Sequence, residues 1–339
     1  MLIIATGISG CGRKQYLERL ANYAKRQGKK IKVYHVGQML FDHAQKVGIH
    51  LTQENVLNTN PSVINAIRGA VFENILANLD KDKKENDAVI ISIHSIFYWK
   101  KRFMRAYDRF YLSKFNPDMF ITFFNRASDI QKELNSRAQW KPQKLTLQEI
   151  LLWQNVEVEM TGSWAEINRT PFYVVSVLQP LNTIYRLIFE PWVETVYICM
   201  PITHLKKKLY QEKVHRFIKK LEKYFIVFNP LNLDSIKGNK PDLATYHHTV
   251  NQDLYWLIKQ SKKVIAYFPV VVASPGVINE LREAHESNKD VWLIFPSKKK
   301  SPFLIYFSNK IFETPKEFFE FLEGKYKQRK IKSRKKPLK

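Results

Sequence analysis

Short apolar runs alternate with amphipathic segments along almost the whole 339-residue chain, and this alternation limits the fold more than any other feature. In the first 190 residues, apolar runs such as Leu2–Thr6 and Ala88–Ile93 are separated by segments such as Ser62–Leu79, whose apolar residues recur at helical spacing. Uninterrupted apolar runs are typical of strands that are buried on both faces of a parallel sheet. Strands separated by helices therefore predict an α/β fold, with helices on both faces of the sheet.

The same alternation restarts near Pro191. It predicts two three-layer α/β/α domains, residues 1–190 and 191–324, the second built on a smaller Rossmann- or flavodoxin-like parallel sheet. The other strands that we expect are Lys30–Val36, Asp118–Phe124, Phe172–Val177, Glu194–Cys199, Phe225–Phe228, Val264–Phe268 and Val291–Phe295. The other helices that we expect are Arg13–Gln27, Gln38–Val47, Thr146–Glu166, Leu205–Tyr224, Ala244–Ser261, Gly276–Ser287 and Pro315–Glu323.

The chain is strongly basic, with 55 Lys and Arg against 31 Asp and Glu, a formal net charge of +24. Nine of the fifteen residues from Lys325 to Lys339 are Lys or Arg and none is acidic. Such a run repels itself, so residues 325–339 are predicted to be a disordered tail. Basic segments bind polyanions by releasing counterions, which favours contact with RNA or the ribosome. A purely solubilising tail is the alternative.

Three features indicate a cytoplasmic protein. With two cysteines, Cys11 and Cys199, the chain can form neither a disulfide framework nor a four-thiolate zinc site, and no other metal site is expected. The longest uncharged apolar stretch, Val264–Val277, contains two prolines and is shorter than the ~18–20 residues of a membrane-spanning helix. The N-terminus lacks the basic region of a signal peptide, so no membrane association is expected.

A glycine-rich loop follows the first strand and opens the first helix, with the sequence Gly-Ile-Ser-Gly-Cys-Gly-Arg-Lys-Gln. Glycines allow successive backbone N–H groups to surround an anion, and the helix N-terminus adds positive potential. We therefore expect this loop to bind ATP or another nucleotide. The residues expected to bind it are Gly7, Gly10, Gly12, Arg13, Lys14 and Gln15. A tight turn without a ligand is the alternative.

The spacing of Gly7 and Gly12 matches the motif GxxxxGK[ST], but the positions after it differ. Arg13 stands where the motif has lysine and keeps the positive charge. Lys14 stands where the motif has the Ser or Thr that usually binds magnesium, which leaves a role for Mg²⁺ in doubt.

Residues 1–190 resemble the archaeal-type adenylate kinases and related P-loop nucleotide kinases. The similar segments are Leu2–Gln15, Val33–Met39, Ile91–His94 and Asn116–Asp118. The resemblance implies a nucleotide-binding kinase fold. The chain departs from the family where Gln38 and Ser92 replace acidic residues, where Thr52–Asn55 replaces an Arg-Asp pair, and where Arg126 and Arg137 alone remain of an arginine-rich lid. We therefore expect a degenerate nucleotide-binding domain rather than an adenylate kinase.

In the second half, Ser274–Glu280 lies after the strand Val264–Phe268 and begins a helix. Ligands bind at this edge of open α/β sheets, so we expect Ser274 and Gly276 to contact a nucleotide and Glu280 to lie close to it.

Residues 196–295 resemble nucleoside 2-deoxyribosyltransferase-like domains and related nucleotide N-glycosidases. The similar segments are Tyr197–Pro201, Asn251–Leu254 and Gly276–Glu280, although Met200, Pro275 and Val277 depart from the family pattern. The resemblance implies that Glu280 is the nucleophile, that Asp253 assists the leaving base or orients Glu280, and that Tyr197 positions the sugar or Glu280.

These features leave several functions open. We favour an enzyme of nucleotide metabolism whose second domain cleaves or transfers the N-glycosidic bond of a nucleoside or nucleotide. A nonenzymatic nucleotide sensor, an RNA- or ribosome-associated factor and a nucleoside monophosphate kinase are the alternatives. The sequence leaves both a monomer and a homo-oligomer open.

Overall fold

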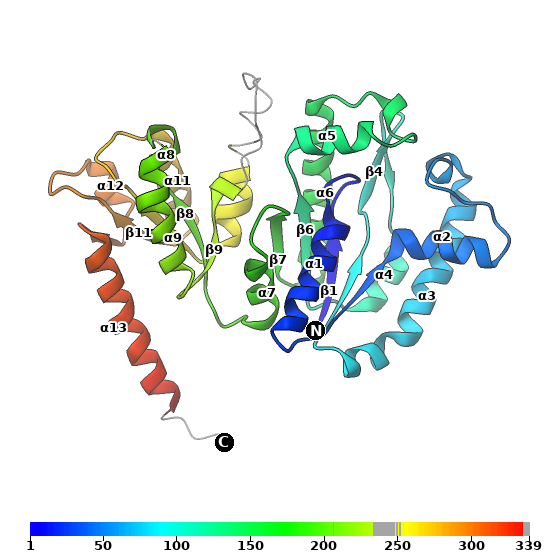
Figure 1. Ribbon diagram of the computed structural model, residues 1–339, viewed down its shortest axis with the longest axis horizontal. Helices are drawn as coiled ribbons and strands as arrows, with labels where there is room; N and C mark the ends of the chain where they lie inside the picture. Colours follow the sequence, from blue (N-terminus) through cyan, green and yellow to red (C-terminus); the bar gives the residue numbers. More distant parts are fainter. Residues whose placement is uncertain (206, 233–247, 249, 251, 335–339) are drawn as a thin grey trace. The chain divides into compact units, whose positions relative to one another are not determined.

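The computed structural model describes residues 1–205, 207–232, 248, 250 and 252–334 (Figure 1). It divides into two compact units. The first comprises Met1–Ile188 with Leu231–Thr249, and the second comprises Phe189–Pro230 with Val250–Lys339. The main segment of the first unit thus ends close to the boundary that we predict at residue 190. The assignment of Leu231–Thr249 to the first unit was not predicted.

The first unit contains a five-stranded sheet in the order β2-β3-β1-β6-β7, with all neighbouring strands parallel. Its strands are β1 (Leu2–Thr6), β2 (Ile31–His35), β3 (Ala88–Ser92), β6 (Met119–Phe124) and β7 (Phe172–Ser176). The three central strands β1, β3 and β6 are buried at every residue, as their uninterrupted apolar runs predict. The parallel α/β architecture is confirmed.

Among the described residues, seven α-helices of the first unit surround this sheet. They are α1 (Arg13–Arg26), α2 (Val36–Lys46), α3 (Pro61–Glu85), α4 (Arg109–Phe115), α5 (Ala127–Asn135), α6 (Leu147–Asn168) and α7 (Leu181–Phe189), with short 3-10 turns η1 (Val56–Asn58) and η2 (Lys141–Gln143). A capping box fixes the start of α6, because the Thr146 hydroxyl accepts from Glu149 N and the Glu149 carboxylate accepts from Thr146 N. Helix α6 carries a residue of the candidate site.

A β-hairpin that the sequence did not predict follows β3. Strands β4 (Ile96–Trp99) and β5 (Arg102–Arg105) pair antiparallel, and Lys100 and Lys101 form the turn at φ 49° and 60°. Two-residue hairpin turns with positive φ are usually made of Asn and Gly, so a Lys-Lys turn gives no sequence signal.

The second unit contains a parallel sheet in the order β12-β11-β10-β8-β9, which confirms the predicted second parallel sheet. Its strands are β8 (Thr195–Cys199), β9 (Ile226–Phe228), β10 (Lys263–Tyr267), β11 (Asp290–Ile294) and β12 (Lys310–Phe312). Strand β12 was not predicted. Tyr197 on β8 is in register with Val264 on β10 and with Phe228 on β9, which places Tyr197 near the middle of the sheet.

The helices of the second unit differ in part from the prediction. They are α8 (Lys207–Leu209), α9 (His215–Leu221), α11 (Pro275–Glu286), α12 (Pro302–Tyr306) and α13 (Pro315–Arg334), with π-helical turns η4 (Tyr210–Val214) and η6 (Gln252–Ile258) and 3-10 turns η3 (Ile202–His204) and η5 (Pro230–Asn232). The single helix expected over Leu205–Tyr224 is interrupted by η4. The helix expected over Ala244–Ser261 lies partly outside the described residues, and η6 is its described part.

Helix α13 is longer than predicted, since its backbone remains helical to Arg334. Disorder of the predicted tail, residues 325–339, stays a prediction, and residues 335–339 lie outside the described part of the chain. Phe318 and Leu322 in the first turns of α13 are fully buried, so packing stabilises the start of this helix. Because extending a helix costs less than starting one, the basic residues that follow can continue it. Among the described residues, no helix has the length and apolar character needed to cross a bilayer.

Candidate functional sites

The glycine loop connects β1 to α1, as predicted. Gly7, Gly10 and Gly12 have φ of 149°, 79° and 88°. A Cβ added at Gly7 would lie 2.6 Å from the carbonyl oxygen of Phe123, so this position requires glycine. Gly12 is the N-cap residue of α1 and is left-handed. The loop therefore presents backbone N–H groups at the N-terminus of a 14-residue helix, the arrangement that binds phosphate groups.

Arg13 lies inside the loop rather than in solvent, with 9% of its surface exposed. Its Nη1 donates to the Gly7 carbonyl oxygen at 2.5 Å, and its Nε donates to Ser92 Oγ at 2.9 Å. Its Nη2 lies 3.4 Å from His94 Nε2. Because arginine only donates hydrogen bonds, His94 accepts at Nε2. Burial and the adjacent Arg13 charge hold the pKa of His94 well below its usual value, so His94 is neutral.

Glu157 of α6 is a residue of this site that sequence reasoning missed. Its carboxylate is fully buried and accepts from Gly7 N at 2.8 Å, Ser95 N at 2.9 Å and Ile96 N at 3.0 Å. The Ser95 hydroxyl donates to it at 2.6 Å. Burial raises the pKa of Glu157, while these hydrogen bonds and the charge of Arg13 act in the opposite direction. Glu157 thus joins the end of β1 to the start of the β4–β5 hairpin.

A cleft of about 550 Å³ opens beside the glycine loop, within the range of small-molecule sites. Its lining includes Gly10, Gly12, Lys14 and Gln15, so the predicted nucleotide-binding residues of the first unit converge on one cavity, although Gly7 lies beneath it. Its cationic and imidazole side chains are Arg13, Lys14, Arg68, Arg105, Arg137, His35 and His94, whereas Glu54 is the single acidic residue among its described lining residues. This charge balance suits a polyphosphate.

The cleft contains two arginines that sequence reasoning missed, Arg68 of α3 and Arg105 of β5. Arg68 is 7% exposed and donates to Asn65 Oδ1 at 2.9 Å. Of the two arginines expected to remain from a lid, Arg137 lines the cleft, while Arg126 pairs with Asp129 at 3.6 Å outside it. The arginines of this cleft therefore come from elements other than residues 52–55, where the sequence has none.

The residues at the loop do not form a magnesium site of the usual kind. Lys14 occupies the position of the usual hydroxyl ligand, and the Ser92 hydroxyl accepts from Arg13. The described residues contain no group of three His, Cys, Asp or Glu side chains that could hold a metal ion. Because Mg²⁺ prefers oxygen ligands, the ammonium of Lys14 cannot replace the usual hydroxyl ligand.

In the second unit, three predicted catalytic residues lie together on one face of the sheet. The Tyr197 hydroxyl of β8 donates to Glu280 Oε1 of α11 at 2.6 Å. Asp253 of η6 is close enough to raise the pKa of Glu280 by charge repulsion. Cys199, two residues beyond Tyr197 on the same face of β8, is fully buried close enough to Glu280 for that carboxyl group to raise its pKa, and it was not predicted as a site residue. The strand alternation could have indicated it.

Electrostatics couple Glu280 and Asp253. Burial raises the pKa of both carboxyl groups, and their mutual repulsion raises that of Glu280 further. The hydrogen bond from Tyr197 favours the ionised form of Glu280. Two buried carboxyl groups that repel one another retain one proton between them at neutral pH. The pair can therefore supply one acid and one base.

Ser274 and Gly276 have different surroundings from those we expected. The Ser274 hydroxyl accepts from Val277 N at 3.5 Å as the N-cap of α11, so it is engaged by the helix. Gly276 is exposed, has no left-handed φ, and a Cβ there would meet no atom within 4 Å. The described structure thus gives Ser274 a capping role and leaves nucleotide contact by either residue a prediction.

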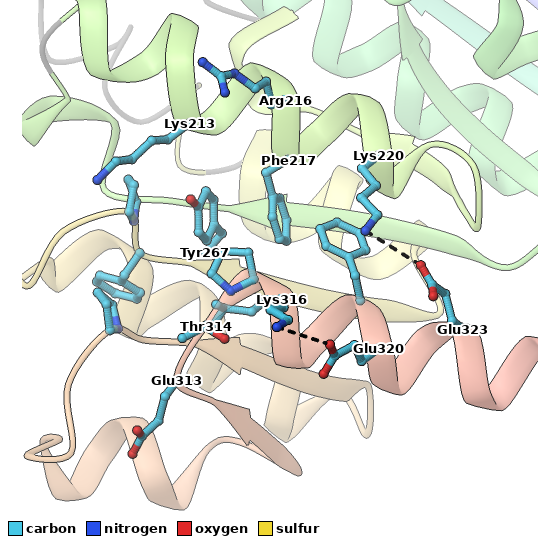
Figure 2. A pocket seen from close by; sticks show the side chains of 16 residues that line it. Lys213, Arg216, Phe217, Lys220, Tyr267, Glu313, Thr314, Lys316, Glu320 and Glu323 are labelled. Atoms are coloured by element: carbon cyan, nitrogen blue, oxygen red, sulfur yellow. Dashed lines mark ion pairs between the residues drawn. The ribbon is translucent and has the colours of Figure 1, made fainter.

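A hollow of about 690 Å³ in the second unit is separate from this cluster (Figure 2). Figure 2 shows Phe217 of α9 against Tyr267, whose rings stack at 4.1 Å. Since Val264 is in register with Tyr197, Tyr267 three residues later points to the opposite face of the sheet. The ion pair Lys220–Glu323 joins α9 to α13 at this hollow, and Lys316 pairs with Glu320 along α13. None of the predicted catalytic residues lines the hollow.

Comparisons with known proteins concern mainly the first unit. A family model described as an AAA domain matches residues 6–150, which include the glycine loop and most of the cleft. No curated protein matches the sequence. A solved structure titled "Crystal structure of TT1252 from Thermus thermophilus" is 10% identical, with a TM-score of 0.33 over 56% of this chain and 97% of that chain, a similarity too low to support an argument.

The family match and the glycine loop agree. The first unit carries a P-loop domain of the nucleotide-binding, kinase-like class. The match ends before the second unit begins, so the resemblance of that unit to deoxyribosyltransferases has no support from the comparisons.

Proposed function

We propose that the first unit binds a nucleoside triphosphate, with its phosphates in the glycine loop, and transfers a phosphoryl group to an acceptor in the same cleft. The observation that supports this most is the position of Arg13, whose guanidinium lies within the loop and donates to the Gly7 carbonyl. A cation at this point neutralises phosphate oxygens that the backbone N–H groups of residues 8–13 surround.

The cleft supplies charge on two sides of the transferred group. Arg13 and Lys14 lie at the loop, and Arg68, Arg105 and Arg137 come from other elements that line the same cavity. Phosphoryl transfer depends mainly on positioning and on neutralising negative charge, which arginines do well because their donors pair with two phosphate oxygens at once. Neutral His94 adds no competing charge, and its contact with Nη2 helps to hold the Arg13 side chain in place.

The matched pair Gly12→Ala and Gly28→Ala tests this proposal. Both glycines are left-handed, at φ 88° and 77°, and neither has a clashing neighbour, but only Gly12 belongs to the loop. Each substitution places a side chain in left-handed backbone at a cost of about 1–2 kcal/mol. We expect similar losses of stability, and at least a tenfold weaker ATP affinity in calorimetric titration for Gly12→Ala alone. Equal affinities in both variants would contradict binding at the loop.

For the second unit, we propose cleavage or transfer of an N-glycosidic bond of a nucleoside or nucleotide. The supporting observation is the hydrogen bond from Tyr197 to Glu280 beside a second buried carboxyl group. In the first step, a Glu280 carboxylate oxygen bonds to the sugar anomeric carbon while the bond to the base breaks. This step requires the proton that the pair retains to lie on Asp253, although the pKa of Glu280, raised to about 8, is above that of Asp253, raised to about 7. The base takes the broken bond's electron pair and that proton. Water or a second base then displaces Glu280 and returns a proton to Asp253.

Glu280→Gln tests this reaction, with Glu286→Gln on the exposed face of the same helix as the control. Released or exchanged base is measured by chromatography across a panel of nucleosides and nucleotides. We expect activity to fall at least 10³-fold in Glu280→Gln and to be unchanged in Glu286→Gln. Full activity in Glu280→Gln would rule out the nucleophile.

Contact between the basic segment 325–339 and RNA or the ribosome stays a prediction, as do cytoplasmic location and any homo-oligomer. RNA affinity that is lost when the basic residues of this segment are replaced by glutamine would support the contact. A nonenzymatic sensor would bind nucleotide tightly and show no turnover in either assay.

A further inference from the structure

The β4–β5 hairpin extends one wall of the nucleotide cleft outward. Phe97 pairs with Met104, and both line the cleft. Trp99 pairs with Arg102 one step further along the hairpin, so these side chains lie on the same face of the ribbon as Phe97 and Met104. This face therefore runs from the cleft to the basic tip of the hairpin.

The tip of the hairpin joins a second basic turn. The Gln143 side chain of η2 accepts from Lys100 N at 3.0 Å, which brings η2 against the tip. Five exposed basic residues gather there, and we refer to them as the hairpin patch: Lys100, Lys101, Arg102, Lys141 and Lys144. The segments 99–105 and 139–148 contain no acidic residue. The nearest carboxylate in sequence, Glu149, pairs with Lys101 at 2.5 Å.

Three lysines of the hairpin patch occupy strained backbone. Lys100, Lys101 and Lys144 have φ of 49°, 60° and 46°, and the other non-glycine residues with positive φ in the described chain are Asn116, Arg169 and Asn288. Left-handed backbone is unfavourable for a side chain such as lysine, and asparagine or glycine would relieve it. Three charges placed at such positions on one surface point to a charged ligand.

We propose that the hairpin patch binds the backbone of a single-stranded nucleic acid, whose terminal nucleotide enters the cleft as the acceptor. This inference rests on the proposed nucleotide-binding function of the cleft. The five residues of the hairpin patch do not line the cleft itself, whereas a strand has a phosphate at every nucleotide and can pair with successive lysines outside it. A cleft of about 550 Å³ admits one unpaired end and no duplex.

Binding of a fluorescein-labelled 12-nucleotide RNA, and of DNA of the same sequence, tests the patch by fluorescence anisotropy in the full chain. The test variant is Lys100→Gln/Lys144→Gln. The matched control, Lys25→Gln/Lys84→Gln, removes two exposed lysines from α1 and α3 at the opposite edge of the sheet. In the test variant alone, we expect about tenfold weaker binding at low salt. The slope of the logarithm of affinity against the logarithm of salt concentration should also be smaller in magnitude by ~1.4, which is ~0.7 for each of the two lost phosphate contacts. Equal binding by both variants would overturn the proposal.

Crosslinking locates the strand independently of affinity. RNA with 4-thiouridine at its terminal position is irradiated on the full chain, and the crosslinked peptides are identified by mass spectrometry. Crosslinks to residues 96–105 or 137–144 would support the proposal, whereas crosslinks confined to residues 325–339, or none, would overturn it. ATP titration of the same variants separates the two proposals. If the protein binds ATP normally but does not bind RNA, only the proposal for the hairpin patch is refuted. If the protein binds RNA but not ATP, the proposed nucleotide site is refuted.

Discussion

Arg13 and Glu157 are opposite charges buried close together beneath the glycine loop, and they illustrate how unequally a sequence reveals its site residues. Arg13 could be predicted because it follows the glycines at a fixed spacing. Glu157 lies 150 residues away in the sequence from Gly7, whose backbone N–H donates to its carboxylate. In the sequence alone, an acidic residue within a long helix cannot be distinguished from an exposed one. Only the folded sheet brings the two residues together. Arg68 and Arg105 were missed for the same reason.

Replacing Glu157 by glutamine should destabilise the first unit. The carboxylate accepts three backbone N–H groups, and a glutamine would direct its own NH₂ donors at one or more of them. A buried donor left unsatisfied costs about 1–3 kcal/mol. We expect a loss of that size in urea unfolding, and no loss in Glu159→Gln, an exposed acid of the same helix. A Glu157→Gln variant as stable as the wild type would show that the carboxylate network adds nothing.

The pair formed by Glu280 and Asp253 makes stability depend on pH. Their pKa values are raised in the folded protein, so the folded state favours the protonated form. This contribution is complete below the ordinary carboxyl pKa and is lost as pH rises through the raised values. We expect calorimetry to show that the free energy of unfolding falls between pH 5 and pH 9 in both proteins, but falls less in Glu280→Gln than in the wild type. The difference should be about 1.4 kcal/mol for each unit of pKa shift that the substitution removes. Parallel curves for both proteins would contradict the raised pKa.

At the scale of elements, central strands were the most predictable and short or interrupted elements the least. Strands β1, β3 and β8 coincide with uninterrupted apolar runs because both of their faces are buried. The β4–β5 hairpin was missed because Ile96–Trp99 is a short run and its turn lacks glycine. The π-helical turn η4 within the expected helix Leu205–Tyr224 leaves no mark on apolar spacing.

Ser274 provides a test of capping against ligand binding at the start of α11. Removing an N-cap hydroxyl costs about 1 kcal/mol, and aspartate serves as an equally good cap. We expect Ser274→Ala to lose about that much stability in thermal unfolding and Ser274→Asp to retain it. Stability unaffected by Ser274→Ala would contradict the capping role.

Lys100 provides the corresponding test of strain in the hairpin. Lys100→Gly removes a side chain from left-handed backbone, which should stabilise the first unit by about 1 kcal/mol. The same change should weaken binding of single-stranded RNA. Thermal unfolding and anisotropy on one preparation measure both effects. A variant that is less stable than the wild type would show that the turn carries no strain.

At the scale of the whole molecule, the repeated alternation of strands and helices was sufficient to predict two parallel α/β sheets, and the structure contains them. The chemistry of each site was the hardest to predict. The residues of each site come from elements that are distant in the sequence, and only the folded sheet brings these elements together at one edge.

Hydrogen exchange with and without ATP tests the central claim, that the loop between β1 and α1 holds nucleotide phosphates, most directly. Backbone N–H groups that donate to phosphate exchange slowly, so ATP should protect peptides that cover residues 7–15 in the wild type, with smaller protection over residues 137–140 of the cleft. Arg13→Ala should lose most of this protection at the same ATP concentration. Protection of other segments with none at residues 7–15, under conditions in which ATP is bound, would contradict the account.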